Sequence, residues 1–395
     1  MPAVLIGCMC VSILATDLYT PSLPSLPEAL NTTPSMAQAT MTASFVGYAL
    51  GPFLVGPLSD RYGRKPALAL GMALFTVFSA ACALAPGIWS LIAARCAQGA
   101  AASVMSVLGV VIIRDLFEGE RALKVMSLYG GAIGVAPAAG PLIGGWIDVT
   151  LGWRAGFWLL AILGALAAWA SWAVVPETGV RTRLDFGLAW RRYGKLVSDR
   201  QFALVGIAVA ATFGGLFAWV TEGPFVFIEK MGVKTEAYGW YYAGGVAAYV
   251  TGALVANRLA DHVSARALTK AGVSVTLVGA LVLLSFVAIG FVTPLSVMVG
   301  MAVFSLGLGL TFASAPLVML ARVPQRLGAA AGVLFGAGQS AGAALGAGSV
   351  AAMHDGTAWP MAISLTAFAT IAAVLVLSTR FMGRAEAAAE GDAKG

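Results

Sequence analysis

A short, densely charged segment, residues 56–66, separates two long apolar runs near the start of the chain. It reads Gly-Pro-Leu-Ser-Asp-Arg-Tyr-Gly-Arg-Lys-Pro, whereas residues 38–55 and 67–85 on either side carry no charged side chain. A charged residue costs roughly 2.5–3.5 kcal/mol at the centre of a membrane helix. The segment therefore cannot lie in hydrocarbon, and we expect a tight loop at one membrane face between two spanning helices.

The remainder of the chain repeats this alternation of apolar runs and short polar breaks. Of its 395 residues, 59% are hydrophobic and 11% charged, against about 25% charged in soluble domains. Runs of about 20 apolar residues are long enough to cross a bilayer as helices. The sequence therefore predicts an all-α polytopic membrane protein, and its net charge of +6 lies in short loops, unlike a nucleic-acid-binding surface.

Cofactor and targeting signals are few. The four cysteines all fall in apolar segments with no disulfide or metal-ligand spacing, and there is no phosphate-binding Gly-Lys-Ser/Thr loop. We therefore expect no metal, no cofactor and no enzymatic activity. The first apolar run lacks a basic leader and continues as a span, so we expect it to stay in the protein. Whether Met1 is the true start is open.

Twelve spans can be counted along the chain. Their approximate ranges are 2–23, 37–57, 66–86, 88–113, 122–147, 154–175, 201–228, 236–257, 267–290, 294–318, 326–352 and 358–381. We expect two pseudo-symmetric six-helix bundles, residues 1–175 and 201–382, because the second half repeats the first charged loop in degraded form at 257–266. A basic cytoplasmic linker, 176–200, would join them, and a disordered cytoplasmic tail, 383–395, would follow.

The distribution of cations predicts the orientation. If the N-terminus is inside, the inner loops and tail hold 20 of the 24 Lys and Arg residues and the outer loops hold three. Such a bias is typical of cytoplasmic loops. We therefore expect both termini to lie in the cytoplasm of a bacterial cell, with the chain in its inner membrane.

Three ionisable residues fall inside predicted spans, namely Asp17, Arg95 and Glu222. Such residues are costly and are expected to face a cavity or a partner. At ~1.5 Å per residue, all three lie ~10 Å from the outer ends of their helices. An Asp17–Arg95 pair that protonation of Asp17 breaks would suit coupling to a proton gradient. The alternatives are that both acids reach outer water and that Arg95 only binds backbone carbonyls.

Polar and aromatic side chains near this depth are candidates for a substrate pocket. We expect contributions from Tyr19, Tyr48, Trp219, Tyr242 and Gln339, although most membrane aromatics only pack. The two histidines, His262 and His354, fall in loops and carry no expected role.

Two further motifs suggest conformational change. The inner loops contain charges that could pair and hold the inner side shut, or that could be ordinary loop charges; they are Asp60, Arg61, Arg64, Lys65, Arg114 and Asp115. The fifth span is rich in glycine and proline, which allow close packing and kinks. The residues concerned are Gly134, Pro137, Gly140, Pro141, Gly144 and Gly145.

Four stretches together resemble the major facilitator superfamily, specifically its Bcr/CflA branch of drug:proton antiporters. They are Asp17-Leu-Tyr-Thr-Pro21, Gly56-x-Leu-x-Asp-Arg-x-Gly-Arg-Lys65, Arg95-x-x-Gln-Gly99 with Arg114-Asp-Leu-Phe117, and Gly140-Pro-x-x-Gly-Gly145. They cover most of the first half, and the second half matches more weakly. The resemblance implies a monomer that exchanges amphipathic drugs for protons across the bilayer.

The same resemblance implies roles for particular residues. It suggests Asp17 as the acid that binds substrate or proton, Arg95 as the arginine tied to proton coupling, and Gly140 to Gly145 as the antiporter kink. Residues 31–34 and 357–360 look like those of chloramphenicol and florfenicol exporters. Glu222 departs from the pattern, since a small or neutral residue is expected there. An extra acid could admit cationic substrates or bind a second proton.

Other functions remain open. An exporter of a sugar or amino-acid derivative could use the same scaffold, although few Asn, Gln or Asp residues occur in the spans. A membrane enzyme or receptor lacks support, because there is no His cluster and no large soluble domain. Substrate range, proton stoichiometry and electrogenicity are not determined by the sequence.

Overall fold

A computed structural model describes residues 1–179, 186–321, 323–324 and 327–378. All regular elements within these ranges are helical. The helices of the first half are α1 (Pro2–Asp17), the 3₁₀ helix η1 (Thr20–Ser25), α2 (Leu26–Ala29), α3 (Pro34–Tyr62), α4 (Arg64–Ala83), α5 (Ile88–Ala102), α6 (Val104–Leu116), α7 (Gly119–Leu151) and α8 (Trp153–Val174). Those that follow are α9 (Phe186–Val197), α10 (Arg200–Pro224), the π-helix η2 (Phe225–Lys230), α11 (Thr235–Leu259), α12 (Ala265–Ala288), α13 (Pro294–Leu320), α14 (Gly328–Met353) and α15 (Trp359–Leu377).

The twelve expected spans correspond to these helices. Ten helical segments in the described part of the chain are long and apolar enough to cross a membrane, counting α1 to α2, α5 with α6, and α10 with η2 as one segment each. The long helices α11 and α14, which are rich in glycine and alanine, complete the twelve. The all-α fold of twelve membrane helices is thus confirmed.

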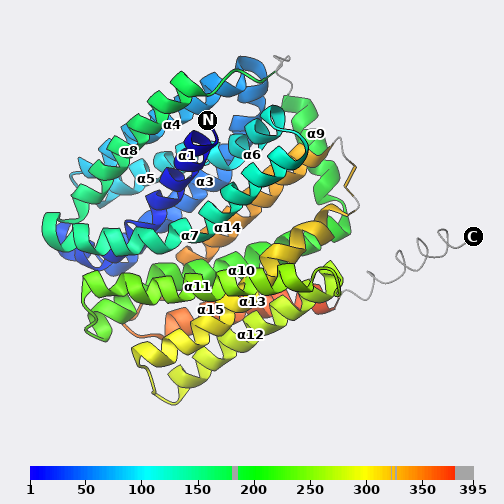
Figure 1. Cartoon of the computed structure of the whole chain (residues 1–395). Helices are drawn as coiled ribbons and strands as arrows, with labels where there is room; N and C mark the ends of the chain where they lie inside the picture. The colour runs from blue at the N-terminus through cyan, green and yellow to red at the C-terminus, as the bar shows by residue number, and fades with distance from the viewer. Residues whose placement is uncertain (180–185, 322, 325–326, 379–395) are drawn as a thin grey trace, which may run out of the picture.

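The helices form two bundles of six, one from α1 to α8 and one from α10 to α15, in agreement with the expected fold class (Figure 1). Two helix pairs form the most extensive contacts between the bundles, because α14 packs on α3 and α11 packs on α7. The exact boundaries at residues 175 and 201 stay predictions. The expected disordered tail, 383–395, lies outside the described residues.

The predicted linker 176–200 contains a helix that the sequence reading missed. In α9, Tyr193 and Leu196 are buried, whereas Trp190, Arg191 and Arg192 are exposed. The rings of Trp190 and Tyr193 lie 5.8 and 5.4 Å from that of Phe53 on α3. Leu196 packs with Phe202 and Val205 of α10. An amphipathic helix therefore lies against both bundles, where the sequence predicts only a polar connection.

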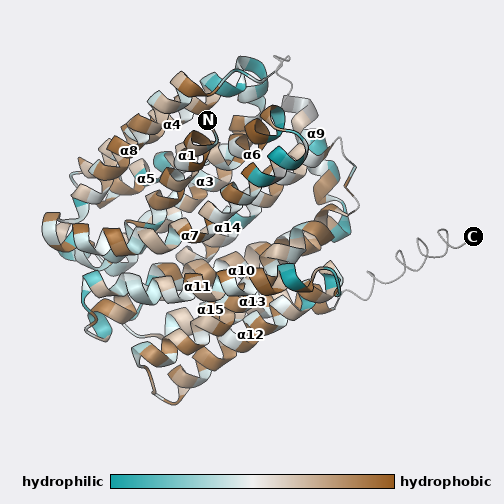
Figure 2. Cartoon of the chain, viewed as in Figure 1, coloured by the Kyte–Doolittle hydropathy of each residue, from teal (hydrophilic) through white to brown (hydrophobic). Residues whose placement is uncertain are grey.

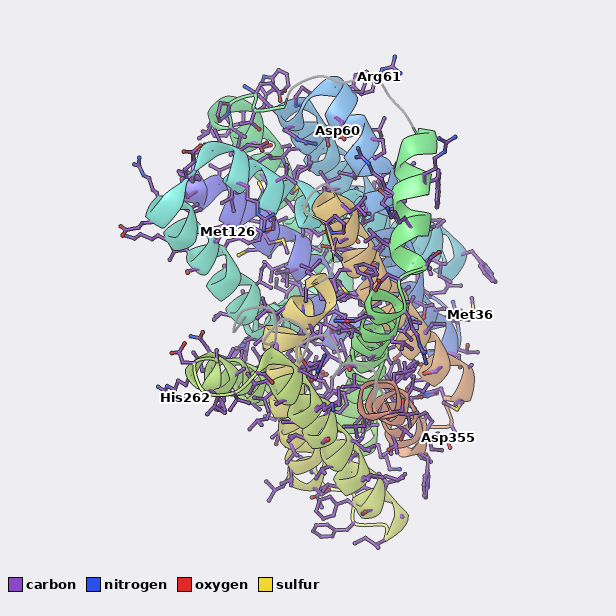
Figure 3. All side chains as sticks on the ribbon, turned by 90° about the vertical axis from the view of Figure 1, so that its right-hand side faces the viewer. Met36, Asp60, Arg61, Met126, His262 and Asp355 are labelled. Carbon is purple, nitrogen blue, oxygen red and sulfur yellow. The ribbon has the colours of Figure 1, made fainter. Side chains whose placement is uncertain are left out.

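Hydrophilic residues gather at the ends of the bundles, and hydrophobic residues predominate along their length (Figure 2). We call the end that carries Arg61, Arg64, Lys65 and α9 the basic end, and the other the opposite end. Figure 3 views the molecule from the side on which α9 lies in Figure 1, with Asp60 and Arg61 together at the top of the picture. Met36 and Asp355 lie on one flank, where α3 begins and α14 ends, while His262 lies on the other.

Candidate functional site

Asp17 is the last residue of α1, just before the chain changes to the 3₁₀ helix η1. Its side chain is 4% exposed. One carboxylate oxygen, Oδ1, accepts a hydrogen bond of 2.9 Å from the hydroxyl of Tyr242 on α11. The Tyr242 ring stacks on Trp219 of α10, with centroids 5.1 Å apart. A carboxylate of the first bundle is thus held by a side chain of the second.

Glycines of α7 permit the close approach that places Asp17. A Cβ atom on Gly140 would lie 2.5 Å from the Cβ of Asp17, and one on Gly144 would lie 1.9 Å from the carbonyl oxygen of Leu18. Any larger residue would push α7 away from the end of α1. The helix continues unbroken through Pro137 and Pro141. The kink stays a prediction, whereas the glycines of this motif determine where the acid lies.

A cavity of about 290 Å³ lies between the two bundles, with Asp17 in its wall. Its lining comes from both halves and is mostly apolar, including Phe45 and Phe217, whose rings contact at 4.3 Å. Asp17 is the one charged side chain among the described residues that line it. A small, largely apolar cavity with a single buried carboxylate suits an amphipathic ligand or a proton.

The expected pocket residues divide into two groups. Tyr48, Trp219, Tyr242 and Gln339 all line the cavity, as do Gly134 and Pro137 of α7. Tyr19 does not, since its hydroxyl pairs with Thr40 at 2.9 Å and its ring packs on Phe157. The chain turns at the end of α1, and Tyr19 then faces the interior of its own bundle.

Arg95 does not form the expected pair with Asp17. Its guanidinium is fully buried and donates to the carbonyl oxygen of Ala15 at 2.9 Å and to Oε1 of Gln98 at 2.6 Å. It also lies over the ring of Tyr19, 4.8 Å from the centroid. The expectation of a direct Asp17–Arg95 ion pair is corrected, because Arg95 binds α1 through its backbone two residues before the acid. The alternative, an arginine that binds carbonyl oxygens, describes this contact.

Glu222 lies outside the central cavity, in a cluster at the opposite end. Its side chain is fully buried, and its Oε1 lies 2.9 Å from Nδ1 of His354. Its other oxygen accepts a short hydrogen bond from Nε2 of Gln38 on α3. The hydrogen bond with Glu222 raises the pKa of His354 above its ordinary value, against the opposing effect of burial.

The sequence reading missed two members of this cluster. His354 was assigned no role because it follows a helix end, yet the fold brings it to Glu222, 132 residues away in the chain. Gln38 is the one amide side chain in the uncharged stretch 34–55 and is fully buried, so its amide could have marked it as a candidate. Glu222 is therefore not exposed to water as a lone acid, which corrects the alternative of a side chain reaching outward.

The charged residues at the basic end contact one another within the first bundle. Arg64 lies 2.7 Å from Asp60 and 4.0 Å from Asp115, so the suggested Arg64–Asp115 contact is present. Its backbone N–H also donates to Glu177 at 2.7 Å. Arg61 and Lys65 lie over the rings of Tyr62 and Trp172 at 5.1 Å, and Arg114 is exposed. These contacts lie among helices of the first bundle and the segment just after α8, so by themselves they do not tie the two bundles together.

Comparison with known proteins places this arrangement in a family. The family model described as Major Facilitator Superfamily matches residues 5–347. A bicyclomycin resistance protein homolog of Haemophilus influenzae is 28% identical over 360 residues, covering 90% of this chain and 89% of its own. A chloramphenicol resistance protein of Pseudomonas aeruginosa is 29% identical over 378 residues, covering 94% and 88%.

A solved structure supports the fold. The xylose transporter XylE from E. coli, in a partially occluded inward open conformation, superposes with a TM-score of 0.75 at 15% identity and covers 97% of both chains. At that identity the likeness concerns the fold alone. The matched family model, the two resistance proteins and the paired six-helix bundles agree: this chain is a multi-pass membrane transporter that belongs to the Major Facilitator Superfamily.

Proposed function

We propose that the chain exports amphipathic small-molecule antibiotics in exchange for protons, by alternating access of the central cavity to the two membrane faces. The observation that carries this proposal is Asp17, a single buried carboxylate in a largely apolar cavity between the bundles. A carboxylate in such surroundings binds a proton or a cationic or hydrogen-bonding ligand, but not both at full strength. Competition between the two couples drug exit to proton entry.

The shape of the cavity supports a small ligand. Its volume of about 290 Å³ is just below the range of ~300–1,000 Å³ that is usual for ligand pockets. The aromatic rings of Tyr48, Trp219 and Tyr242 offer flat apolar surfaces, and Gln339 offers an amide. Chloramphenicol and florfenicol, which carry an aromatic ring and polar substituents, are the substrates we propose to test first. The named chloramphenicol resistance relative supports this choice.

We place the protein in the bacterial inner membrane as a monomer, with the basic end and both termini in the cytoplasm. Lys and Arg collect at the loops of that end, as expected for cytoplasmic loops. The opposite end, with Glu222 and His354, then faces outward. We assign the charged contacts around Arg64 to holding the first bundle together during the conformational change. Each is worth about 0–1 kcal/mol where exposed.

Export of a metabolite, such as a sugar or amino-acid derivative, is the second candidate. The fold is compatible with it, because the chain superposes on a sugar transporter, although at 15% identity that likeness concerns the fold alone. Against it stands the cavity wall, where Gln339 is the one amide side chain among the described lining residues. A sugar site would need more hydrogen-bonding side chains to replace the water around several hydroxyls.

Drug susceptibility in an efflux-deficient bacterial host tests the proposal. The panel contains chloramphenicol, florfenicol and the lipophilic cation ethidium, and the chain is compared with empty vector, Asp17→Asn and the exposed control Glu229→Gln. We expect the chain and Glu229→Gln to raise tolerance equally, and Asp17→Asn to return it to the level of the vector at equal membrane expression. If no compound responds to the correctly inserted parent chain, drug export is rejected and the metabolite candidate takes its place.

A further inference from the structure

The cluster of Glu222, His354 and Gln38 joins the two bundles at the end opposite the basic end. Gln38 belongs to α3 of the first bundle, Glu222 to α10 of the second, and His354 follows α14 of the second. Both Gln38 and Glu222 are fully buried, and the His354 side chain is 9% exposed. Any movement that separates α3 from α10 at this end must break the hydrogen bond between Gln38 and Glu222.

The hydrogen-bond inventory indicates which proton state this arrangement has. An ionised carboxylate only accepts hydrogen bonds, and here Oε2 of Glu222 accepts from Gln38 while Oε1 faces Nδ1 of His354. A proton on Oε2 would meet the donating amide of Gln38 and remove this bond. A proton on Oε1 would leave only a weaker, neutral acceptor for Gln38. The closed arrangement therefore fits an ionised Glu222.

His354 adds a second constraint on the protons. Its Nδ1 lies 2.9 Å from Glu222 and 3.2 Å from Nε2 of Gln38. One ring nitrogen cannot donate to the carboxylate and also accept from the amide. When Nδ1 of His354 carries a proton, the amide of Gln38 therefore donates to Glu222 and not to His354. The contact between the bundles then depends on the charge of the Glu222 carboxylate.

Protons can reach the cluster from the surface. A second cavity, of about 170 Å³, is lined by Glu222 together with Glu229, Lys230 and Thr357. Glu229 and Lys230 are exposed, so the cavity borders the surface at this end. The charged groups around the cluster are Glu229 and Lys230 from η2 and Asp355 beside His354. None of the described residues that line this cavity comes from α11, whose Tyr238 packs on the ring of Phe227 in η2.

We propose that Glu222, Gln38 and His354 form a proton-binding latch that closes the opposite end of the central cavity. Gln38 of the first bundle holds ionised Glu222 of the second, and releases it when Glu222 takes up a proton from the solution at that face. The proton stays on the Glu222 carboxyl while that end is open and returns to the same solution on closing. This inference rests on the proposed alternating access and adds a second titrating carboxylate to Asp17.

Cysteine accessibility tests the latch without measuring transport. Ser340 lines the central cavity on α14, so Ser340→Cys reports access when a membrane-impermeant thiol reagent is added outside intact cells. The rate is divided by that of Phe291→Cys, a position that is 55% exposed between α12 and α13, which corrects for thiol ionisation. Parent protein without either substitution gives the background from Cys8, Cys10, Cys82 and Cys96.

We expect the normalised labelling of Ser340→Cys to increase as the external solution is acidified. With Glu222→Gln added, labelling at neutral pH should increase roughly tenfold, as loss of a charge-assisted hydrogen bond implies, and should no longer respond to pH. Gln38→Ala should increase it similarly while leaving both titrating residues in place. The matched control Glu229→Gln, a carboxylate of the same cavity outside the cluster, should behave like the parent.

The outcomes separate the latch from the proposed function. The latch would be overturned if labelling were unchanged in folded Gln38→Ala and Glu222→Gln. It would also be overturned if the pH response persisted in Glu222→Gln or disappeared in Glu229→Gln. Either result would count against the latch even if drug export is confirmed. The reverse result, a labelling response as expected without transport of any drug, would support the latch and reject drug export. Folding is checked by membrane insertion and by a single symmetric peak in gel filtration, and Gln38→Ala serves if Glu222→Gln fails this check.

Discussion

The two buried carboxylates, Asp17 and Glu222, look alike in the sequence and differ in the structure. Each lies in an apolar helix near the same end of the molecule, and each accepts a hydrogen bond from the other bundle, Asp17 from Tyr242 and Glu222 from Gln38. Asp17 lines the central cavity, whereas Glu222 has a histidine partner and lines only the smaller surface cavity. A buried acid is thus suited to binding a ligand or to holding a contact according to what faces it.

The largest expected difference between the two acids is in coupling. The assay uses everted membrane vesicles that have an acidic interior. In vesicles that contain the parent protein, addition of a transported drug should let protons leave the interior. Asp17→Asn should abolish this release because the competing site for drug and proton is lost, whereas Glu222→Gln should keep a measurable part of it. Fluorescence of an acridine dye that reports the gradient measures the effect. If Glu222→Gln lost this proton release and Asp17→Asn kept it, Glu222 would be the coupling residue and Asp17 would not.

The next effect concerns the packing that positions Asp17. Gly144→Ala puts a Cβ where the carbonyl oxygen of Leu18 lies, 1.9 Å away, whereas Gly130→Ala on the same helix meets nothing within 4 Å. Overpacking of this kind costs typically 1–3 kcal/mol. We expect Gly144→Ala to lower the thermal unfolding temperature in detergent and to impair transport, with Gly130→Ala close to the parent. Equal effects of both substitutions would contradict the role of the close contact.

A smaller effect is expected at the donor to Asp17. Tyr242→Phe removes the hydroxyl that donates to Oδ1 and keeps the ring stacked on Trp219. A hydrogen bond to a charged group contributes about 1.5–3 kcal/mol, so transport efficiency, kcat/KM for the drug, should change by at least about tenfold. The adjacent Tyr241→Phe is the matched control, since Tyr241 lies outside the cavity lining. Similar kinetics for the two variants would show that the hydroxyl is dispensable.

The smallest effect concerns His354 and depends on pH. Its pKa is raised above the ordinary value of 6.5, first by the hydrogen bond with Glu222. Because the folded state binds the His354 proton more tightly than the unfolded state, protonated His354 stabilises the fold. This stabilisation is fully present below pH 6.5 and is lost as pH rises through the raised pKa. The difference in unfolding temperature between parent and His354→Gln should therefore be largest in mildly acidic buffer and shrink in alkaline buffer. A difference that grows with pH would contradict the assigned contact.

Most of the expected cavity-lining residues could be predicted from the sequence, but the contacts between buried side chains could not. Tyr48, Trp219, Tyr242 and Gln339, which line the cavity, are predicted from their depth and their aromatic or polar side chains. Depth follows from the sequence because helix rise converts residue number into position along the bilayer. Depth does not tell which side of a helix faces the cavity, so Tyr19 was misplaced. Arg95 and Asp17 lie at similar depth, yet Arg95 binds the backbone of Ala15, a partner with no sequence signal.

The chain's apolar runs and cation-rich loops by themselves determined the class of protein, the twelve helices and the expected orientation, because hydrocarbon excludes charge and unpaired backbone groups. The tertiary structure decided which buried acid faces the cavity and which faces a histidine. The hydrogen bonds that each acid accepts from the other bundle join residues far apart in the chain. Asp17 and Tyr242 are 225 residues apart, and Gln38 and Glu222 are 184 residues apart. Contacts at such separations depend on how the two bundles pack, which no local pattern records.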